Sequence, residues 1–179
     1  MHNYSFSKDL SNCEQFEFKP YIVETAFDYY NFAYRNYGKL DISACLSALA
    51  IEIAFKSFLA KPIENIGKVN ELYTGYRGHE LYTLLCQIPS GIADFIVEEK
   101  DRDLLRLYND YFLKGRYVYE QKDDCTPHYK KHYEFIKLAG KIITSVLYLY
   151  REKGCDDAFI TNLNIDVFYT STLMTPMHK

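Results

Sequence analysis

Residues 41–60, DISACLSALAIEIAFKSFLA, have the periodicity of a helix that is apolar on nearly every side. Asp41 is predicted to cap its N-terminus, and Pro62 to end it. Only a narrow strip that holds Glu52 and Lys56 stays charged. Such a helix must be covered on several sides, so the sequence predicts a helical bundle with this segment at its centre. Its two apolar stripes are Ile42, Leu46, Leu49 and Ile53, and Ala44, Ala48, Ile51, Phe55 and Phe58.

Other segments repeat apolar residues every three or four positions and are predicted to be helices at 20–37, 79–88, 100–113 and 127–153. The fold class is therefore all-α, a bundle of four to five main helices with short extra helical turns and a C-terminal extension. The polar connections between the helices are predicted to be loops, the longest at 61–78 and 114–126. In the tail, a β-friendly stretch suits an edge strand or a docking arm, and it holds Ile165, Val167, Phe168 and Tyr169.

Length and composition favour one domain with a real core. The chain has 179 residues, of which 48% are hydrophobic. We expect an N-terminal arm at 1–19, a helical domain at 20–153 and a C-terminal extension at 154–179. The 18 Tyr and 12 Phe, with no Trp, predict a core edged by tyrosine hydroxyls that need hydrogen-bond partners.

Charge and targeting signals exclude several protein classes. The net charge of −3 argues against a strongly basic nucleic-acid binder, although a local basic pocket fits it. The first residues lack the apolar core of a signal peptide, and no stretch approaches 18 uninterrupted apolar residues. The five cysteines are spread out without a CxxC pair, which argues against a disulfide framework. We therefore expect a reduced, cytoplasmic protein with no membrane segment.

Metal and cofactor motifs are absent from the sequence. No glycine-rich phosphate loop or dinucleotide fingerprint is present. His79-Glu80 begins like a zinc-protease motif, but Thr83 stands where the second histidine would be. His128 and His132 have a spacing that can hold a metal, yet they sit at a polar helix start beside two lysines. We predict no metal site and no cofactor.

Two polar groups stand out in the first half of the chain. Glu52 and Lys56, four residues apart, suit an intrahelical ion pair, and the pair also suits the floor of a polar pocket. Arg77-Gly78-His79-Glu80 opens a helix, where free backbone N–H groups favour an anion and Arg77 and His79 add donors. The alternative is a capping arrangement in which His79 and Glu80 satisfy the backbone.

Lys114-Gly115-Arg116-Tyr117 follows a predicted helix end. Cations at that position complement the helix dipole. They also suit a phosphate contact, in which the Arg116 guanidinium holds the oxygens and the Tyr117 ring stacks on a base.

Three landmarks follow one another along the chain: the buried helix ALAIEIAFKSFL, the helix start Gly78-His79-Glu80-Leu81 and the segment YNDYFLKGRY, followed by a long final helix. This order resembles the HEPN superfamily of small, all-helical bacterial and archaeal domains. The similarity covers roughly residues 20–153. It implies a HEPN-like bundle of four or five helices that is usually a homodimer. Many members are metal-independent RNases of toxin–antitoxin or phage-defence systems, and others bind nucleotides, RNA or a partner protein.

The family's RNase site is an Arg-x(4–6)-His motif, and this sequence has no such pair. The closest spacings place Tyr108 after Arg102 and Tyr111 after Arg106. Tyrosine, with an ordinary pKa near 10, is a poor general base at neutral pH. No catalytic residue is therefore transferred from the family.

Three functions remain, and we rank them in order. The first is a non-catalytic HEPN-like dimer that binds RNA, a nucleotide or a protein partner. The second is a divergent metal-independent endoribonuclease, in which His79 and Arg116 meet from different helices. The third is a structural subunit of a larger complex with a tyrosine-rich surface. The anion-contacting residues of the first function would be Arg77, His79, Lys114, Arg116 and Tyr117.

Overall fold

The computed structural model describes residues 6–65, 71–75, 77–115 and 129–174. It confirms a mostly helical chain and adds one small two-stranded hairpin. The long helices are α1 (Pro20–Arg35), α2 (Leu40–Leu59) and α7 (Tyr129–Glu152). The shorter elements are β1 (Lys61–Glu64), β2 (Leu72–Thr74), α3 (Leu81–Leu85), α4 (Ser90–Ile96), the 3₁₀ turn η1 (Glu99–Asp101), α5 (Arg102–Leu107), α6 (Tyr111–Gly115), α8 (Ala158–Asn162) and α9 (Ile165–Met174).

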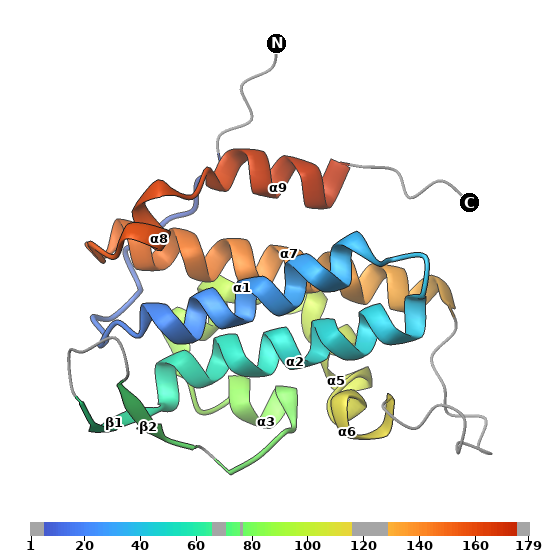
Figure 1. Ribbon diagram of the computed structural model, residues 1–179, viewed down its shortest axis with the longest axis horizontal. Coiled ribbons are helices and arrows are strands. Elements are labelled where there is room, and N and C mark those ends of the chain that lie inside the picture. The colour runs from blue at the N-terminus through green and yellow to red at the C-terminus, as the bar shows by residue number, and fades with distance from the viewer. Residues whose placement is uncertain (1–5, 66–70, 76, 116–128, 175–179) are drawn as a thin grey trace.

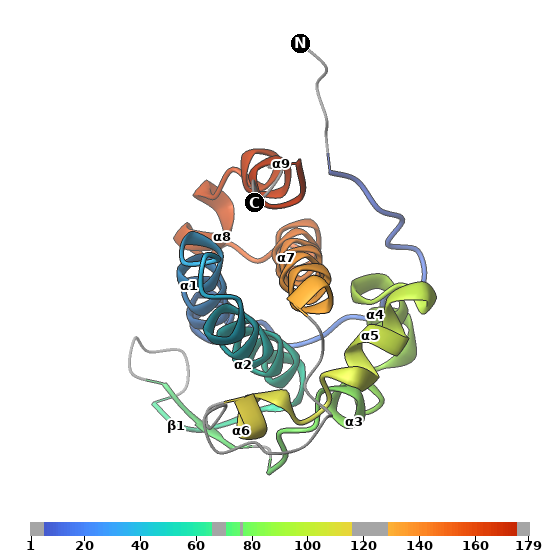
Figure 2. The same ribbon diagram turned by 90° about the vertical axis from the view of Figure 1, so that its right-hand side faces the viewer.

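Helix α2 lies at the centre of the bundle, as its apolar pattern predicts. It packs against α1 and α7 and is crossed on another side by α3 and α6. Figures 1 and 2 show α7 behind the α1–α2 pair, with α8 and α9 above, α3 and α6 below, and α4 and α5 toward the back. In one stripe, Ala44, Ala48, Ile51 and Phe55 are fully buried and Phe58 is partly buried. The other stripe is left partly open, because Ile42 is exposed and Leu46 is only half-buried.

Helix α2 is also the one described helix that is long and apolar enough to cross a membrane by length and composition. The core helix of a globular bundle passes the same test. Of its most apolar stretch, 61% is buried against the rest of the protein. This degree of burial is typical of a core helix in a bundle.

Three predicted segments differ from the structure. Part of the predicted loop 61–78 forms an antiparallel hairpin, in which Lys61 pairs with Thr74. The predicted helix 100–113 is broken into η1, α5 and α6. At the second break Asn109 leaves the helix and caps α3 instead, because its carbonyl oxygen accepts from the Leu81 N–H at 2.8 Å and its Oδ1 from the Tyr82 N–H at 2.7 Å.

The β-friendly tail stretch is a helix, α9, which corrects the edge-strand prediction. The Asn164 Oδ1 accepts from the Val167 N–H at 3.0 Å and caps this helix. The Phe168 ring packs against the rings of Phe27 and Tyr30 on α1. Packing of α9 against α7, and of the Phe168 ring against α1, outweighs the strand propensity of the sequence.

The described part of the N-terminal arm packs along the bundle. The Phe6 ring contacts those of Tyr148 and Tyr169, and the Lys8 ammonium donates to the Phe95 carbonyl oxygen at 2.7 Å. Further along, Phe16 packs against the buried Tyr150. The predicted polar arm therefore adds side chains to the core.

Gly91 is the point where the arm comes closest to α4. A Cβ at this position would lie 1.8 Å from the Asn12 backbone carbonyl oxygen, so the two backbones could not keep their places. We expect Gly91→Ala to lower the free energy of unfolding by about 1–3 kcal/mol, as overpacking does. Urea unfolding measures the loss, and limited proteolysis reports release of the arm. Gly38→Ala is the control, because nothing lies within 4 Å of its Cβ; equal stability of the two variants would contradict the prediction.

Candidate functional site

Glu52, Lys56 and His79 form one polar cluster, which we call the Glu52 cluster. The Lys56 ammonium donates to Oε1 of Glu52 at 2.7 Å, and His79 Nδ1 lies 2.9 Å from the same oxygen. The Glu52 side chain is 5% exposed, whereas that of His79 is 46% exposed. The structure thus confirms the predicted ion pair and joins it to His79, which the sequence placed in a separate group.

Local structure explains why His79 lies over Glu52. Gly78, directly before it, has a φ of +155°, a backbone conformation that favours glycine. The chain then enters α3, whose N-terminus is held by Asn109. The His79 ring also lies 6.3 Å from the Phe112 ring of α6, measured between centroids. The imidazole is therefore positioned by contacts with both α2 and α6.

This arrangement defines the protonation pattern of the imidazole. An ionised carboxylate only accepts hydrogen bonds, so His79 Nδ1 carries the hydrogen that faces Glu52. Nε2 has no partner among the described residues, and it is the nitrogen that can accept a proton or contact a ligand. The other oxygen of Glu52, Oε2, is buried and has no hydrogen-bond partner in the described part of the chain. A buried carboxylate that orients a half-exposed histidine can serve anion binding or proton transfer.

The other predicted anion contacts have mixed positions. Arg77 is exposed, and no described residue forms an ion pair with it. Lys114, at the end of α6, pairs with Asp110 at 2.5 Å, so a carboxylate already neutralises its charge. Arg116 and Tyr117 lie outside the described residues. Of all the site residues predicted from the sequence, the structure brings together Glu52, Lys56 and His79. Arg77 lies two residues before His79 along the chain.

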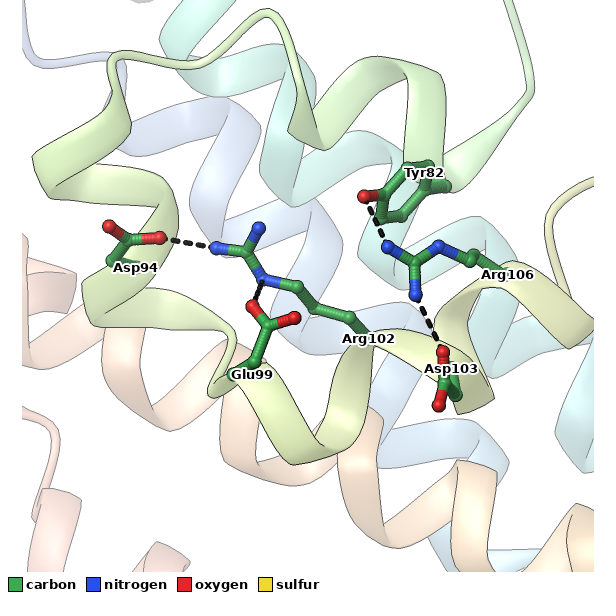
Figure 3. Close-up of polar contacts among 6 residues, drawn as sticks. All are labelled: Tyr82, Asp94, Glu99, Arg102, Asp103 and Arg106. Atoms are coloured by element: carbon green, nitrogen blue, oxygen red, sulfur yellow. Dashed lines mark hydrogen bonds and ion pairs between the residues drawn. The ribbon is translucent and has the colours of Figure 1, made fainter.

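Carboxylates hold the two arginines that come closest to the family's motif spacing, as Figure 3 shows. Arg102 forms ion pairs with Asp94 and Glu99. Arg106 pairs with Asp103 at 2.6 Å and donates to the Tyr82 hydroxyl at 2.6 Å. A phosphate at either arginine would have to compete with these acidic groups.

A groove of about 700 Å³ between α5 and α7 is a weaker candidate. Its charges come in both signs, since Lys141 pairs with Asp101 at 3.2 Å and Lys100 with the neighbouring Glu98 at 2.6 Å. Its charged lining is Lys100, Lys131, Lys137, Lys141, Asp101, Asp103 and Glu134. Four cations against three anions give little selectivity for a negatively charged ligand.

Sequence reasoning missed a second polar cluster, around His132. His132, which the sequence placed at a polar helix start, is buried, and its Nε2 lies 3.0 Å from Oδ1 of Asp41. The Tyr108 hydroxyl lies 2.6 Å from Nδ1, and that of Tyr111 lies 3.4 Å from Nε2. Asp41 is therefore a partner of His132, which corrects its predicted role as an N-cap; the cap residue is Lys39, without a side-chain hydrogen bond.

Burial dominates the electrostatics of the His132 cluster. Desolvation lowers the pKa of His132 below its ordinary value of 6.5, and the Asp41 carboxylate opposes that shift. Burial also raises the pKa values of the Tyr108 and Tyr111 hydroxyls. At neutral pH the cluster is a neutral imidazole with its tyrosine partners and one carboxylate. Together these bonds fix α2, α6 and α7 to one another, which is a structural role.

No metal site is found among the described residues, where no group of three His, Cys, Asp or Glu side chains converges. His128, which has the spacing of a metal-binding pair with His132, lies outside the described residues. Comparison of the chain with protein-family models, with curated proteins and with solved structures found no match.

Proposed function

We propose that this protein is a non-catalytic, HEPN-like cytoplasmic homodimer that binds the phosphate groups of RNA or of a nucleotide at the Glu52 cluster. The observation that carries the proposal is the contact between the buried Glu52 carboxylate and the half-exposed imidazole of His79. The resemblance adds a toxin–antitoxin or phage-defence setting to the proposal.

The charges of the cluster support an anionic ligand. The Lys56 ammonium already compensates the Glu52 carboxylate at 2.7 Å. A phosphate that accepts a hydrogen bond from His79 stabilises the imidazolium form of His79. The Lys56 ammonium, the His79 imidazolium and the Glu52 carboxylate together then carry one net positive charge. Arg77 adds a second cation two residues before His79 and has no carboxylate partner among the described residues. A hydrogen bond between charged groups of this kind contributes about 1.5–3 kcal/mol.

Fluorescence anisotropy with a labelled single-stranded RNA, and with ATP and GTP as competitors, tests the binding in the presence of EDTA. We expect His79→Ala and Arg77→Ala each to weaken binding about tenfold, which corresponds to about 1.4 kcal/mol. Arg106→Ala is the matched control, because that guanidinium is already held by Asp103 and Tyr82. Equal affinities of all three variants and the wild type, or no binding by the wild type, would overturn the proposal.

The second candidate function is a metal-independent endoribonuclease, and the orientation of His79 favours it. A carboxylate at Nδ1 leaves Nε2 to take the proton of a ribose 2′-hydroxyl, as general base catalysis requires. A denaturing gel of the same protein–RNA samples shows whether the protein cleaves the RNA. Cleavage that persists in EDTA and is lost in both His79→Ala and Glu52→Gln would make the protein an enzyme. Intact RNA beside retained binding leaves the first function in place.

A further inference from the structure

Helices α1 and α2 expose an aromatic surface, which we call the outer α1–α2 face. Its large side chains are Tyr21, Tyr29 and Phe32 on α1 and Ile42 on α2, exposed by 64%, 39%, 59% and 52%. A hollow of about 570 Å³ lies on this face, and its lining includes Tyr21, Tyr29 and Phe32 of α1 and Leu46 of α2. Figure 2 shows α7 on the opposite side of this helix pair. Contiguous exposed apolar side chains of this size mark an interaction surface.

Three charged residues lie on or beside the same face of α1. Asp28 and Arg35 follow Tyr21 at seven and fourteen positions, so they lie in line with it on the helix. Glu24 lies one turn before Asp28. No described residue pairs with any of the three charged side chains, although ion pairs are common elsewhere in the chain. The helix dipole favours the same order of charges, so the order alone requires no partner. The dipole of α1 does not explain why large aromatic side chains are exposed between these charges.

The order of these charges makes the face complementary to itself. In a dimer with a twofold axis across α1, if residue i of one copy lies opposite residue j of the other, then residue j of the first copy lies opposite residue i of the second. Two antiparallel copies of α1 then bring Arg35 of each opposite Glu24 and Asp28 of the other, with Phe32 near the axis. A uniformly basic or uniformly acidic partner would leave one of these charges unpaired, and a second copy leaves none.

We propose that the outer α1–α2 face is the contact between two copies of this chain, with their α1 helices antiparallel across a twofold axis. The proposal names the interface of the homodimer in the proposed function. It places the Glu52 cluster away from the contact, because His79 and α6 cover the side of α2 that carries Glu52, whereas Ile42 and Leu46 lie on its open stripe.

Sedimentation velocity over a range of concentrations tests the interface. We expect a dimer for the wild type and a monomer for Phe32→Glu, which places a charge near the axis. We expect Arg35→Glu to weaken dimerisation at least tenfold. The triple variant Glu24→Arg, Asp28→Arg, Arg35→Glu inverts every pair and is expected to restore the dimer. Glu152→Arg on α7 is the control for a surface charge reversal, and circular dichroism confirms that each variant is folded.

Each result decides the inference separately from the proposed function. A monomeric wild type, a dimeric Phe32→Glu variant, or a triple variant as monomeric as Arg35→Glu would overturn it. A monomer whose RNA affinity still depends on His79 would overturn this inference together with the homodimer, and would leave phosphate binding at the Glu52 cluster in place. A dimer built as expected that binds no RNA or nucleotide would overturn only the proposed function.

Discussion

Tyr108→Ala is expected to lower the free energy of unfolding by about 3–5 kcal/mol, as the loss of other buried aromatic side chains does. Tyr108 is fully buried, its ring is stacked on Phe135 at 3.9 Å between centroids, and its hydroxyl lies 2.6 Å from His132 Nδ1. The variant leaves a cavity and removes the hydroxyl next to His132 Nδ1 at once. A loss of this size is a large part of the 5–15 kcal/mol that a typical domain has. Urea unfolding followed by circular dichroism measures it.

Two further variants separate the causes of that loss. Tyr108→Phe keeps the stack on Phe135 and removes only the hydroxyl, so it is expected to cost about 1–3 kcal/mol. Leu107→Ala is the matched control, because the side chain of this neighbouring residue is 45% exposed and its loss should change stability by less than about 0.5 kcal/mol. A Tyr108→Ala variant no less stable than Leu107→Ala would contradict the stacked, buried position of the ring.

Lowering the pH from 7.5 to 5.5 is expected to destabilise the protein through His132. Burial lowers the pKa of His132 in the native state, against the opposing effect of Asp41, while the unfolded chain keeps the ordinary value of 6.5. Below that value the unfolded chain binds a proton that the native state excludes. The free energy of unfolding then falls by up to about 1.4 kcal/mol for each pH unit, until the native pKa is reached.

Thermal and urea unfolding across this pH range measure the slope. His132→Gln is expected to be less stable than the wild type at pH 7.5, because the contacts of His132 with Asp41 and Tyr108 change. Its free energy of unfolding is also expected to depend less steeply on pH. Leu107→Ala serves as the control and should keep the wild-type slope, since this side chain carries no titratable group and is 45% exposed. A slope that is identical in the wild type and His132→Gln would assign the acid sensitivity to other groups.

The bundle was predictable wherever the decisive contacts are local. The apolar period of 41–60 predicted α2 and its central position, and the spacing of Glu52 and Lys56 predicted their ion pair, which forms within one helix. Pro20 marked the start of α1 correctly. These signals depend on residues within about one helical turn of each other, so a single sequence carries them.

The parts that failed depend on contacts between distant segments. Asn109 ends a helix because it caps α3, a stretch 27 residues earlier, and its own neighbours give no sign of that competition. His132 finds Asp41 and Tyr108 only when α2 and α7 pack together, so its burial could not be read from the lysines beside it. The Glu52 cluster was half predicted for the same reason, since the ion pair is local and the contact with His79 is not.

The contacts of the N-terminal arm also affect the timing of folding during synthesis. The Phe6 N–H donates to Oδ1 of Asp166 at 2.6 Å, 160 residues later, and the Lys153 ammonium donates to the Cys13 carbonyl oxygen. At typical elongation rates of about 5–20 residues per second, the arm waits roughly 8–30 seconds for these partners. The Phe6 ring stays uncovered on the nascent chain for a similar time, because its partners Tyr148 and Tyr169 are made equally late. Completion of this fold is therefore a late event, in which a segment made early is among the last to be secured.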